Sequence, residues 1–418
     1  MYSKTLQFII ILIVLSLVTN SNLSVAADES ESAYALDQII AMALERNPRV
    51  AGAEGVVRQS RGQQVAAGAY LNPSITGSAG RGSIRDPSTG VSITERTVTV
   101  EQPLEWPALR AARQRAADAG LASAMAGLDE TRLALVADVK VAFFQLLLAQ
   151  RDRQLAGQNL TTVEAVTEAV KVRVKSGEGA RFEIIKATVE VQKARKEVSR
   201  TQNALQVART RLDMLAGNGL GKDARVRGEF QSTRPRQSLS ELITRAIGQN
   251  PTLRRQHHLV EQADHLIVKE QASKIPGFTM QGTYHREAGD EAITAGISMP
   301  IPLWYRRQGE IESALGAKRQ TEAEWLRLRN EIEQTVTQHF QDAQTASEQL
   351  AVFEEGLLKQ AEEALEIAKF SFQQGAASLL DVLDAQRVYR QTLWEYAQAR
   401  ADLSISLAKL ERWTGGAS

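Results

Sequence analysis

The chain has 418 residues, with 50 lysines and arginines against 49 aspartates and glutamates. This balance gives no basic field for nucleic acid, so we expect no nucleic-acid partner. Cysteine is absent, which excludes disulfides and a lipid-anchored N-terminal cysteine. The sequence also has no phosphate-binding loop, dinucleotide fingerprint, nucleophile elbow or metal-binding helix motif, so we expect no enzymatic activity, cofactor or resident metal.

Residues 1–27 have the pattern of a secretory signal peptide. Lys4 precedes an apolar run over residues 8–18, and small residues end the segment at Ala26 and Ala27. This run is shorter than the about 20 residues that a membrane-spanning helix needs, although an uncleaved anchor is the alternative. No later stretch reads as a long uncharged apolar run. Any membrane-embedded part is therefore expected to be a closed β-barrel.

The sequence contains an internal repeat. Residues 36–48 (LDQIIAMALERNP) share Leu, Ile, Ala, Asn and Pro at equal spacing with residues 239–251 (LSELITRAIGQNP). Residues 215–217 (LAG) correspond in the same way to residues 413–415 (WTG). Similarity over such a long period indicates a duplicated half. We expect one repeat over residues 28–217 and a second over 239–418, joined by a linker at 218–238.

Each half predicts the same order of elements. A short capped helix ends at Asn-Pro, and a second helix, two strands, a very long helix, a glycine-containing turn and a returning helix follow. The long helices are expected over residues 108–175 and 307–374, without an internal proline. Each would span about 100 Å and bury its apolar stripe against other helices, as in a coiled coil. The fold class is therefore mainly α with a small β part. A purely structural periplasmic coiled coil is the competing interpretation.

Apolar and polar residues alternate over 278–284 and 293–301, and more weakly over 75–79 and 97–100. This period of two is typical of membrane β-strands, and residues 85–90 and 288–291 are expected to be polar turns. Four strands cannot close a barrel, and eight would be filled by their own side chains. Twelve strands from three chains would leave a lumen, so a homotrimer is expected. Trp106, Trp304 and Tyr305 follow the strands, where aromatic residues meet lipid headgroups.

With its duplication, its two Asn-Pro steps and its two glycine turns, the chain resembles the TolC family of outer-membrane efflux proteins. The most specific stretch, residues 370–386 (FSFQQGAASLLDVLDAQ), is similar to the family's helical turn at the periplasmic tip. The turn at residues 174–183 matches less well, because Ala180 stands where the family has Ser or Thr. The resemblance implies a passive duct in the outer membrane, largely periplasmic. It would serve a proton-driven inner-membrane exporter of the resistance-nodulation-division (RND) type through a periplasmic adaptor.

The resemblance also implies the site residues. Asp381 and Asp384 would ring the narrow periplasmic end of the pore and favour cations. The contacts with the adaptor would come from the two turns, at Gly177, Glu183, Gly375 and Ser378. The alternative is that Ser378 and Asp381 only cap a helix and that the glycines only form turns.

The cargo is indicated by a local similarity. Residues 101–107 (EQPLEWP) and Arg110, Arg113 and Arg115 resemble the branch that serves heavy-metal cation pumps. We therefore expect divalent heavy-metal cations, with drug efflux and type I protein secretion as alternatives. A set of His257, His258 and His265 could bind metal, but solvated histidines are the favoured interpretation. A duct must release its cargo, so tight metal ligands are not expected in it.

Overall fold

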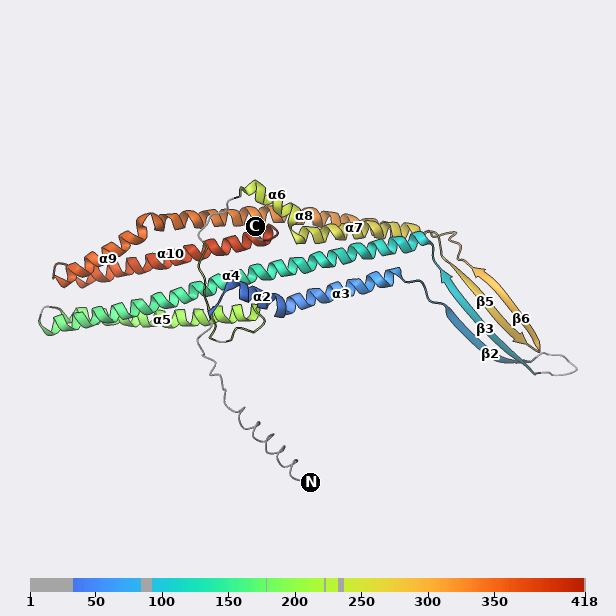
Figure 1. The fold of residues 1–418 in the computed structure, drawn as a ribbon, viewed down its shortest axis with the longest axis horizontal. Helices are drawn as coiled ribbons and strands as arrows, with labels where there is room; N and C mark the ends of the chain where they lie inside the picture. Colours follow the sequence, from blue (N-terminus) through green and yellow to red (C-terminus); the bar gives the residue numbers. More distant parts are fainter. Residues whose placement is uncertain (1–32, 84–91, 178, 222, 232–236, 417–418) are drawn as a thin grey trace, which may run out of the picture.

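The computed structural model describes residues 33–83, 92–177, 179–221, 223–231 and 237–416. The molecule is elongated, with helical hairpins at one end and a four-stranded sheet at the other (Figure 1). The predicted signal peptide and the predicted turn at residues 85–90 lie outside the described residues.

The first half of the chain contains two short helices, a hairpin and a pair of long helices. Its elements are β1 (Ala33–Tyr34), α2 (Leu36–Arg46), α3 (Pro48–Gly68), β2 (Ser74–Ser83), β3 (Ser92–Leu104), α4 (Pro107–Lys175) and α5 (Arg181–Leu215). The short strand β4 (Arg225–Val226) follows and pairs in parallel with β1.

The second half has the same order with one interruption. Its elements are α6 (Leu239–Gln249), α7 (Pro251–Ala272), β5 (Phe278–Glu287), β6 (Asp290–Ser298), α8 (Gln308–Val352), the π-helical turn η1 (Phe353–Leu357), α9 (Leu358–Gln373) and α10 (Leu379–Trp413). The predicted succession of short helix, second helix, hairpin, long helix and returning helix is therefore present in both halves.

Each Asn-Pro step separates two helices, as the sequence predicts. Asn47 and Asn250 have extended backbones, and each side chain accepts a hydrogen bond from the N–H two residues later. The proline that follows begins the next helix, where its missing N–H costs nothing and its fixed φ is already helical. Local chemistry thus sets the boundary between the two short helices in both halves.

The main core lies around the middle of α4. Leu135, Val139, Phe143 and Leu146 are almost fully buried there against α2, α5 and the β4 segment. Contrary to the sequence-based expectation, α4 is apolar enough to cross a membrane by length and composition, and it is the one such helix among the described residues. Its apolar stretch is used for this protein core. The buried apolar residues of this stretch therefore pack against neighbouring elements of the same chain.

The second long helix is not continuous, which corrects the prediction over residues 307–374. At η1 the backbone of Gly356 reaches φ 146°, between α8 and α9. Glycine can adopt this conformation because it has no Cβ. Inside an ordinary helix, glycine is less favourable than alanine by only about 1 kcal/mol. The aromatic ring of Phe353 packs 5.9 Å from that of Tyr396 on α10. No proline marks the interruption, so the sequence pattern missed it.

The four strands form one antiparallel sheet in the order β2-β3-β5-β6. The turn between β5 and β6 is tighter than predicted, because Ala288 (φ 53°) and Gly289 (φ 103°) complete it alone and Asp290 already pairs with Glu287. Two consecutive positive φ angles are typical of type I′ hairpins. The predicted alternation beyond Ser298 also lies past the end of β6. The described sheet is open, with β2 and β6 at its edges.

Candidate functional site

The register of the sheet places most of the large apolar residues of its strands on one face. Residues directly opposite in antiparallel strands point to the same side. Val98 lies opposite Tyr284, which lies opposite Ile293, and Met280 lies opposite Ile297. Ile293 is 85% exposed and Ile297 70%. A single chain therefore leaves a continuous apolar surface without protein cover.

The opposite face is polar. Thr97 Oγ1 lies 2.9 Å from His285 Nδ1, and His285 Nε2 lies 3.3 Å from a Glu287 carboxylate oxygen. Glu95 approaches the same imidazole at 3.8 Å. Thr99 and Thr283 join their hydroxyls across β3 and β5 at 3.1 Å. The two faces of the sheet thus suit different surroundings, one apolar and one aqueous.

The predicted aromatic residues lie at the junction of sheet and helices, as the sequence indicates. The indole N–H of Trp106 donates to the carbonyl of Pro276 at 2.8 Å, and its ring packs 5.9 Å from Phe278. Trp304 is 90% exposed. The hydroxyl of Tyr305 donates to a Glu310 carboxylate oxygen at 2.5 Å. All three residues therefore lie just past the strands, where the sheet joins the helices.

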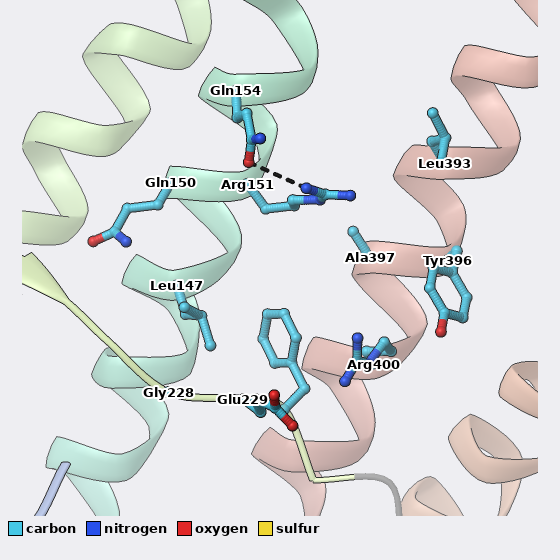
Figure 2. Close-up of a pocket in the computed structure, with 11 residues that line it drawn as sticks. Leu147, Gln150, Arg151, Gln154, Gly228, Glu229, Leu393, Tyr396, Ala397 and Arg400 are labelled. Carbon is cyan, nitrogen blue, oxygen red and sulfur yellow. Dashed lines mark hydrogen bonds between the residues drawn. The ribbon is translucent and has the colours of Figure 1, made fainter. Parts of the chain in front are cut away.

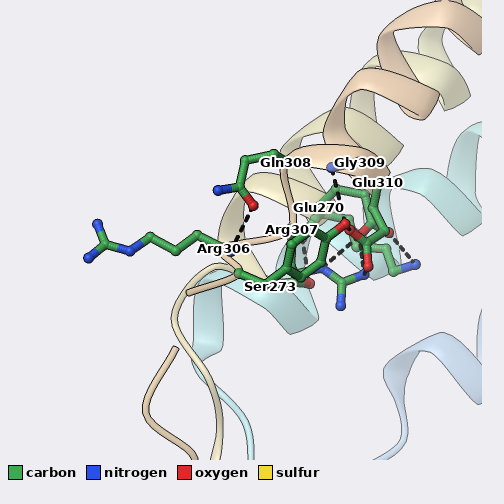
Figure 3. Close-up of polar contacts among 9 residues, drawn as sticks. Glu270, Ser273, Arg306, Arg307, Gln308, Gly309 and Glu310 are labelled. Carbon is green, nitrogen blue, oxygen red and sulfur yellow. Dashed lines mark hydrogen bonds and ion pairs between the residues drawn. The ribbon is translucent and has the colours of Figure 1, made fainter. Parts of the chain in front are cut away.

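The same junction is tied together by charges (Figure 3). Arg307, whose backbone is left-handed at φ 61°, directly precedes α8 and forms an ion pair with Glu270 of α7. Burial acts to raise the pKa of Glu270, but hydrogen bonds from Arg307 and Lys269 bring that pKa below its usual value. The hydrogen bond between Tyr305 and Glu310 lowers the pKa of Glu310 and raises the pKa of Tyr305. These contacts fix the direction in which α8 leaves the sheet.

Four of the predicted site residues lie in the turn between α9 and α10 and at the start of α10. Gly375 has φ 76° and donates to the carbonyl of Phe372, while Ala376 donates to that of Ser371. This pair of bonds is the Schellman ending that glycine allows. Ser378 then caps α10: its hydroxyl accepts from the Asp381 N–H, and Asp381 Oδ2 accepts from the Ser378 N–H at 2.8 Å.

Both candidate pore carboxylates are exposed and lie one turn apart on α10, and both have local partners. Hydrogen bonds from the hydroxyl and backbone N–H of Ser378 hold the pKa of Asp381 below its usual range. Asp384 forms an ion pair with Arg387 on the same helix. The structure therefore confirms that Asp381 takes part in a helix cap. A role for both residues in a pore stays a prediction.

The turn between α4 and α5 also contains a left-handed glycine. Gly177 has φ 82° and ends α4, but Ala180 at the start of α5 supplies no side-chain cap. Glu183 lies in the first turn of α5. The two hairpin ends meet in one apolar cluster formed by Val170, Ala187, Phe372, Leu379 and Val382. The predicted adaptor residues therefore lie at one end of the molecule, opposite the sheet (Figure 1).

A cavity of about 600 Å³ lies between α4 and α10, and sequence reasoning did not predict it. Figure 2 shows the lining residues Arg151 and Gln154 on α4, Tyr396 and Arg400 on α10, and Glu229 on the segment after β4. Arg151 donates to Gln154 at 3.1 Å. The lining residues come from three distant stretches of chain, so no local motif could have identified them.

The three histidines considered as metal ligands do not converge. Both His257 and His258 approach Glu261, at 3.4 and 2.7 Å, and the hydrogen bond with His258 lowers the pKa of Glu261. Over the described ranges, no group of three or more His, Asp or Glu residues is arranged to hold a metal ion. The local arrangement is that of partly solvated side chains on one helix.

Comparison with known proteins agrees with this architecture. The chain is 26% identical to the cobalt-zinc-cadmium resistance protein CzcC of Cupriavidus metallidurans, over 74% of each chain. It is 22% identical to the pyoverdine export outer membrane protein OpmQ of Pseudomonas aeruginosa, over 91% of this chain and 83% of that protein.

Solved structures show the same fold. The channel CusC superposes with a TM-score of 0.77 at 18% identity, covering 91% of this chain and 92% of that chain. The outer membrane protein VceC of Vibrio cholerae gives a TM-score of 0.76 at 19% identity, covering 91% and 96%. The outer membrane efflux protein family matches residues 39–218 and again 242–416. The chain therefore belongs to the outer membrane efflux protein family.

Proposed function

We propose that this chain is one subunit of a trimeric exit duct that carries divalent heavy-metal cations across the outer membrane. The main support for a duct comes from the sheet, which has four strands, one apolar and one polar face, and two open edges. Unpaired strand edges and exposed polar backbone are not tolerated in lipid. Copies of the sheet must therefore pair edge to edge, with the apolar faces outward.

The number of subunits follows from the number of strands. Two copies would give eight strands, which side chains fill, whereas three give twelve strands and a lumen. We propose that β2 of one subunit pairs with β6 of the next. Trp106, Trp304 and Tyr305 would then form the aromatic ring on the periplasmic side of the lipid.

The duplication supports the same arrangement. We propose repeats over residues 28–217 and 239–418 with a linker at 218–238, because the family matches two separate stretches and Asn47 and Asn250 cap equivalent helices. Each subunit would contribute two helical hairpins to a tube below the barrel. The helix α4, of 69 residues, would extend about 100 Å into the periplasm.

The hairpin ends define where the partners act. We propose that Gly177, Glu183, Gly375 and Ser378 face a periplasmic adaptor, which connects the duct to an RND-type proton/cation antiporter in the inner membrane. Asp381 and Asp384 would form the constriction at this entrance, where carboxylates favour cations. The duct itself performs no chemistry, and the inner-membrane pump supplies the energy.

The cargo is supported by two observations. The relative CzcC is named for resistance to cobalt, zinc and cadmium. The polar face of the sheet, which would line the lumen, carries the carboxylates of Glu95, Glu101 and Glu287, and these suit cations better than anions. Export of an organic molecule is the second candidate, because OpmQ, named for pyoverdine export, matches 91% of this chain.

Conductance measurements test the proposed duct, and tolerance measurements test the proposed cargo. Purified protein in a planar bilayer should give cation-selective single-channel currents and should run as a trimer after cross-linking. A water-soluble chain without current would refute the duct. Deletion of the gene should lower tolerance to cobalt, zinc or cadmium and leave tolerance to organic toxicants unchanged; the reverse result would favour the organic cargo.

A further inference from the structure

The apolar face of the sheet ends in arginines at its far end from the helices. Arg96 of β3 lies directly opposite Arg286 of β5. Arg81 of β2 lies opposite Thr94, two residues before Arg96 and therefore on the same face. We call Arg81, Arg96 and Arg286 the arginine row. It crosses three adjacent strands near the end that points away from the helical body (Figure 1).

The arginine row is not neutralised within the chain. Like charges directly opposite in a sheet are destabilising. Arg286 has an ion pair with Glu291 at 3.4 Å, but within the part of the chain that the structure describes neither Arg81 nor Arg96 forms one. All three side chains are exposed. Three arginines and one glutamate leave a net positive surface that needs an anionic partner.

The next row of residues on this face is apolar. Two positions from Arg96 and Arg286 lie Val98 and Tyr284, with Ile293 beside them. Two residues of a strand advance about 7 Å, so one molecule can touch both rows. A molecule that binds both rows must therefore carry phosphate or carboxylate groups close to hydrocarbon chains. A soluble anion would use only the charges.

We propose that the arginine row binds the phosphate groups of a phosphorylated membrane lipid whose acyl chains lie along Val98, Tyr284 and Ile293. Guanidinium groups match phosphate oxygens with paired hydrogen bonds, and arginine is retained next to apolar surface because it is weakly hydrated. The inference rests on the proposed function, since it requires the apolar face to contact lipid. It adds a specific lipid site on the outer wall of the duct.

Native mass spectrometry of the detergent-solubilised trimer tests the site. The trimer is titrated with diphosphoryl lipid A and with the same lipid lacking its phosphates. The test variant is Arg81→Gln with Arg96→Gln, which removes the two unpaired guanidinium groups. The matched control is Arg58→Gln with Arg61→Gln, two exposed arginines of α3 without a side-chain partner in the described structure.

We expect the wild type and the control to retain the phosphorylated lipid about tenfold more tightly than the test variant. Equal retention of the dephosphorylated lipid by the wild type, or equal loss in the control, would overturn the inference. Excess inorganic phosphate should displace little lipid, and full displacement would reduce the site to a general anion site and also overturn it. Single-channel conductance of the same samples separates the two proposals, because a conducting trimer without lipid preference refutes the lipid site alone.

Discussion

The side-chain amide of Asn250 donates to the backbone carbonyl of Trp413 at 2.9 Å, which joins the start of α7 to the end of α10. Its oxygen simultaneously accepts from the Thr252 N–H at 2.8 Å. Asn47 makes the equivalent bond to the carbonyl of Leu215 at the end of α5, also at 2.9 Å. One asparagine thus caps one helix and satisfies a free terminal carbonyl of another.

Replacing Asn250 should therefore disturb two helices at once. We expect Asn250→Ala to lower the free energy of unfolding by about 1–3 kcal/mol, from the lost cap and the unsatisfied, partly buried carbonyl. Circular dichroism during thermal unfolding in detergent measures this change. Asn203→Ala, at an exposed position inside α5, is the control and should be neutral or slightly stabilising. Equal effects of the two changes would contradict the double role of Asn250.

Helix capping can be tested by adding a cap at the start of α5 and by removing one at the start of α10. Ala180→Ser places a cap three residues before Glu183, as Ser378 lies before Asp381, and should stabilise the start of α5 by about 1 kcal/mol. Ser378→Ala should weaken the start of α10 by a similar amount. Hydrogen exchange of the first turn of each helix measures both. A slower exchange in Ser378→Ala would show that the cap does not stabilise α10.

The same cap gives a pH dependence. The pKa of Asp381 is lowered in the folded state by its bonds with Ser378, so the carboxylate contributes stability above its ordinary pKa and loses it as the pH falls through the lowered value. The protection factor at the start of α10, which compares the measured exchange rate with the intrinsic rate at the same pH, should fall only in that acidic range. Asp381→Asn should remove this dependence, whereas Asp384→Asn should leave it unchanged. A protection factor that already falls near neutral pH would contradict the assignment.

A buried amide pair connects the two hairpins. Gln386 Nε2 donates to Asn159 Oδ1 at 3.1 Å, while Asn159 Nδ2 and Gln386 Oε1 have no hydrogen-bond partner among the residues that the structure describes. Gln386→Leu should cost about 1–3 kcal/mol, because Asn159 is then left wholly unpaired. The double change to Leu at both positions should recover much of this loss. A double-mutant cycle by denaturant unfolding measures the coupling, and simple additivity would show that the pair contributes nothing.

Gly356 should tolerate a side chain poorly. At φ 146° an alanine is strained, so we expect Gly356→Ala to lower stability by about 1–3 kcal/mol or to remove the π turn. Gly316→Ala, inside α8 with open space around its Cα, should instead stabilise by up to about 1 kcal/mol. Thermal unfolding compares them. Equal stabilisation by both changes would mean that the turn carries no strain for alanine.

The proposed constriction makes an electrical prediction. Asp381→Ala with Asp384→Ala should raise single-channel conductance and weaken block by a trivalent cation about tenfold, or about 1.4 kcal/mol. Arg387→Ala is the opposing control, because it frees Asp384 from its ion pair and should strengthen the block. Planar-bilayer recordings measure both. Unchanged conductance and block in both variants would place these carboxylates outside the pore.

Local chemistry determined what the sequence could predict. The alternation over residues 278–284, the Asn-Pro helix boundaries and the turn at Gly375 each depend on a few neighbouring residues, and each is present in the fold. The cap formed by Ser378 and Asp381 has the same origin. The resemblance that identified the family also rests on these local patterns.

Packing between distant segments decided the rest. The apolar stretch of α4 is a protein core because α2, α5 and the β4 segment cover Phe143, and the π turn at Gly356 brings Phe353 against Tyr396. The alignment of Arg96 with Arg286 depends on the register of strands about 190 positions apart. A one-residue slip would move one of them to the other face. Such relationships follow from tertiary contacts, which no spacing along the chain encodes.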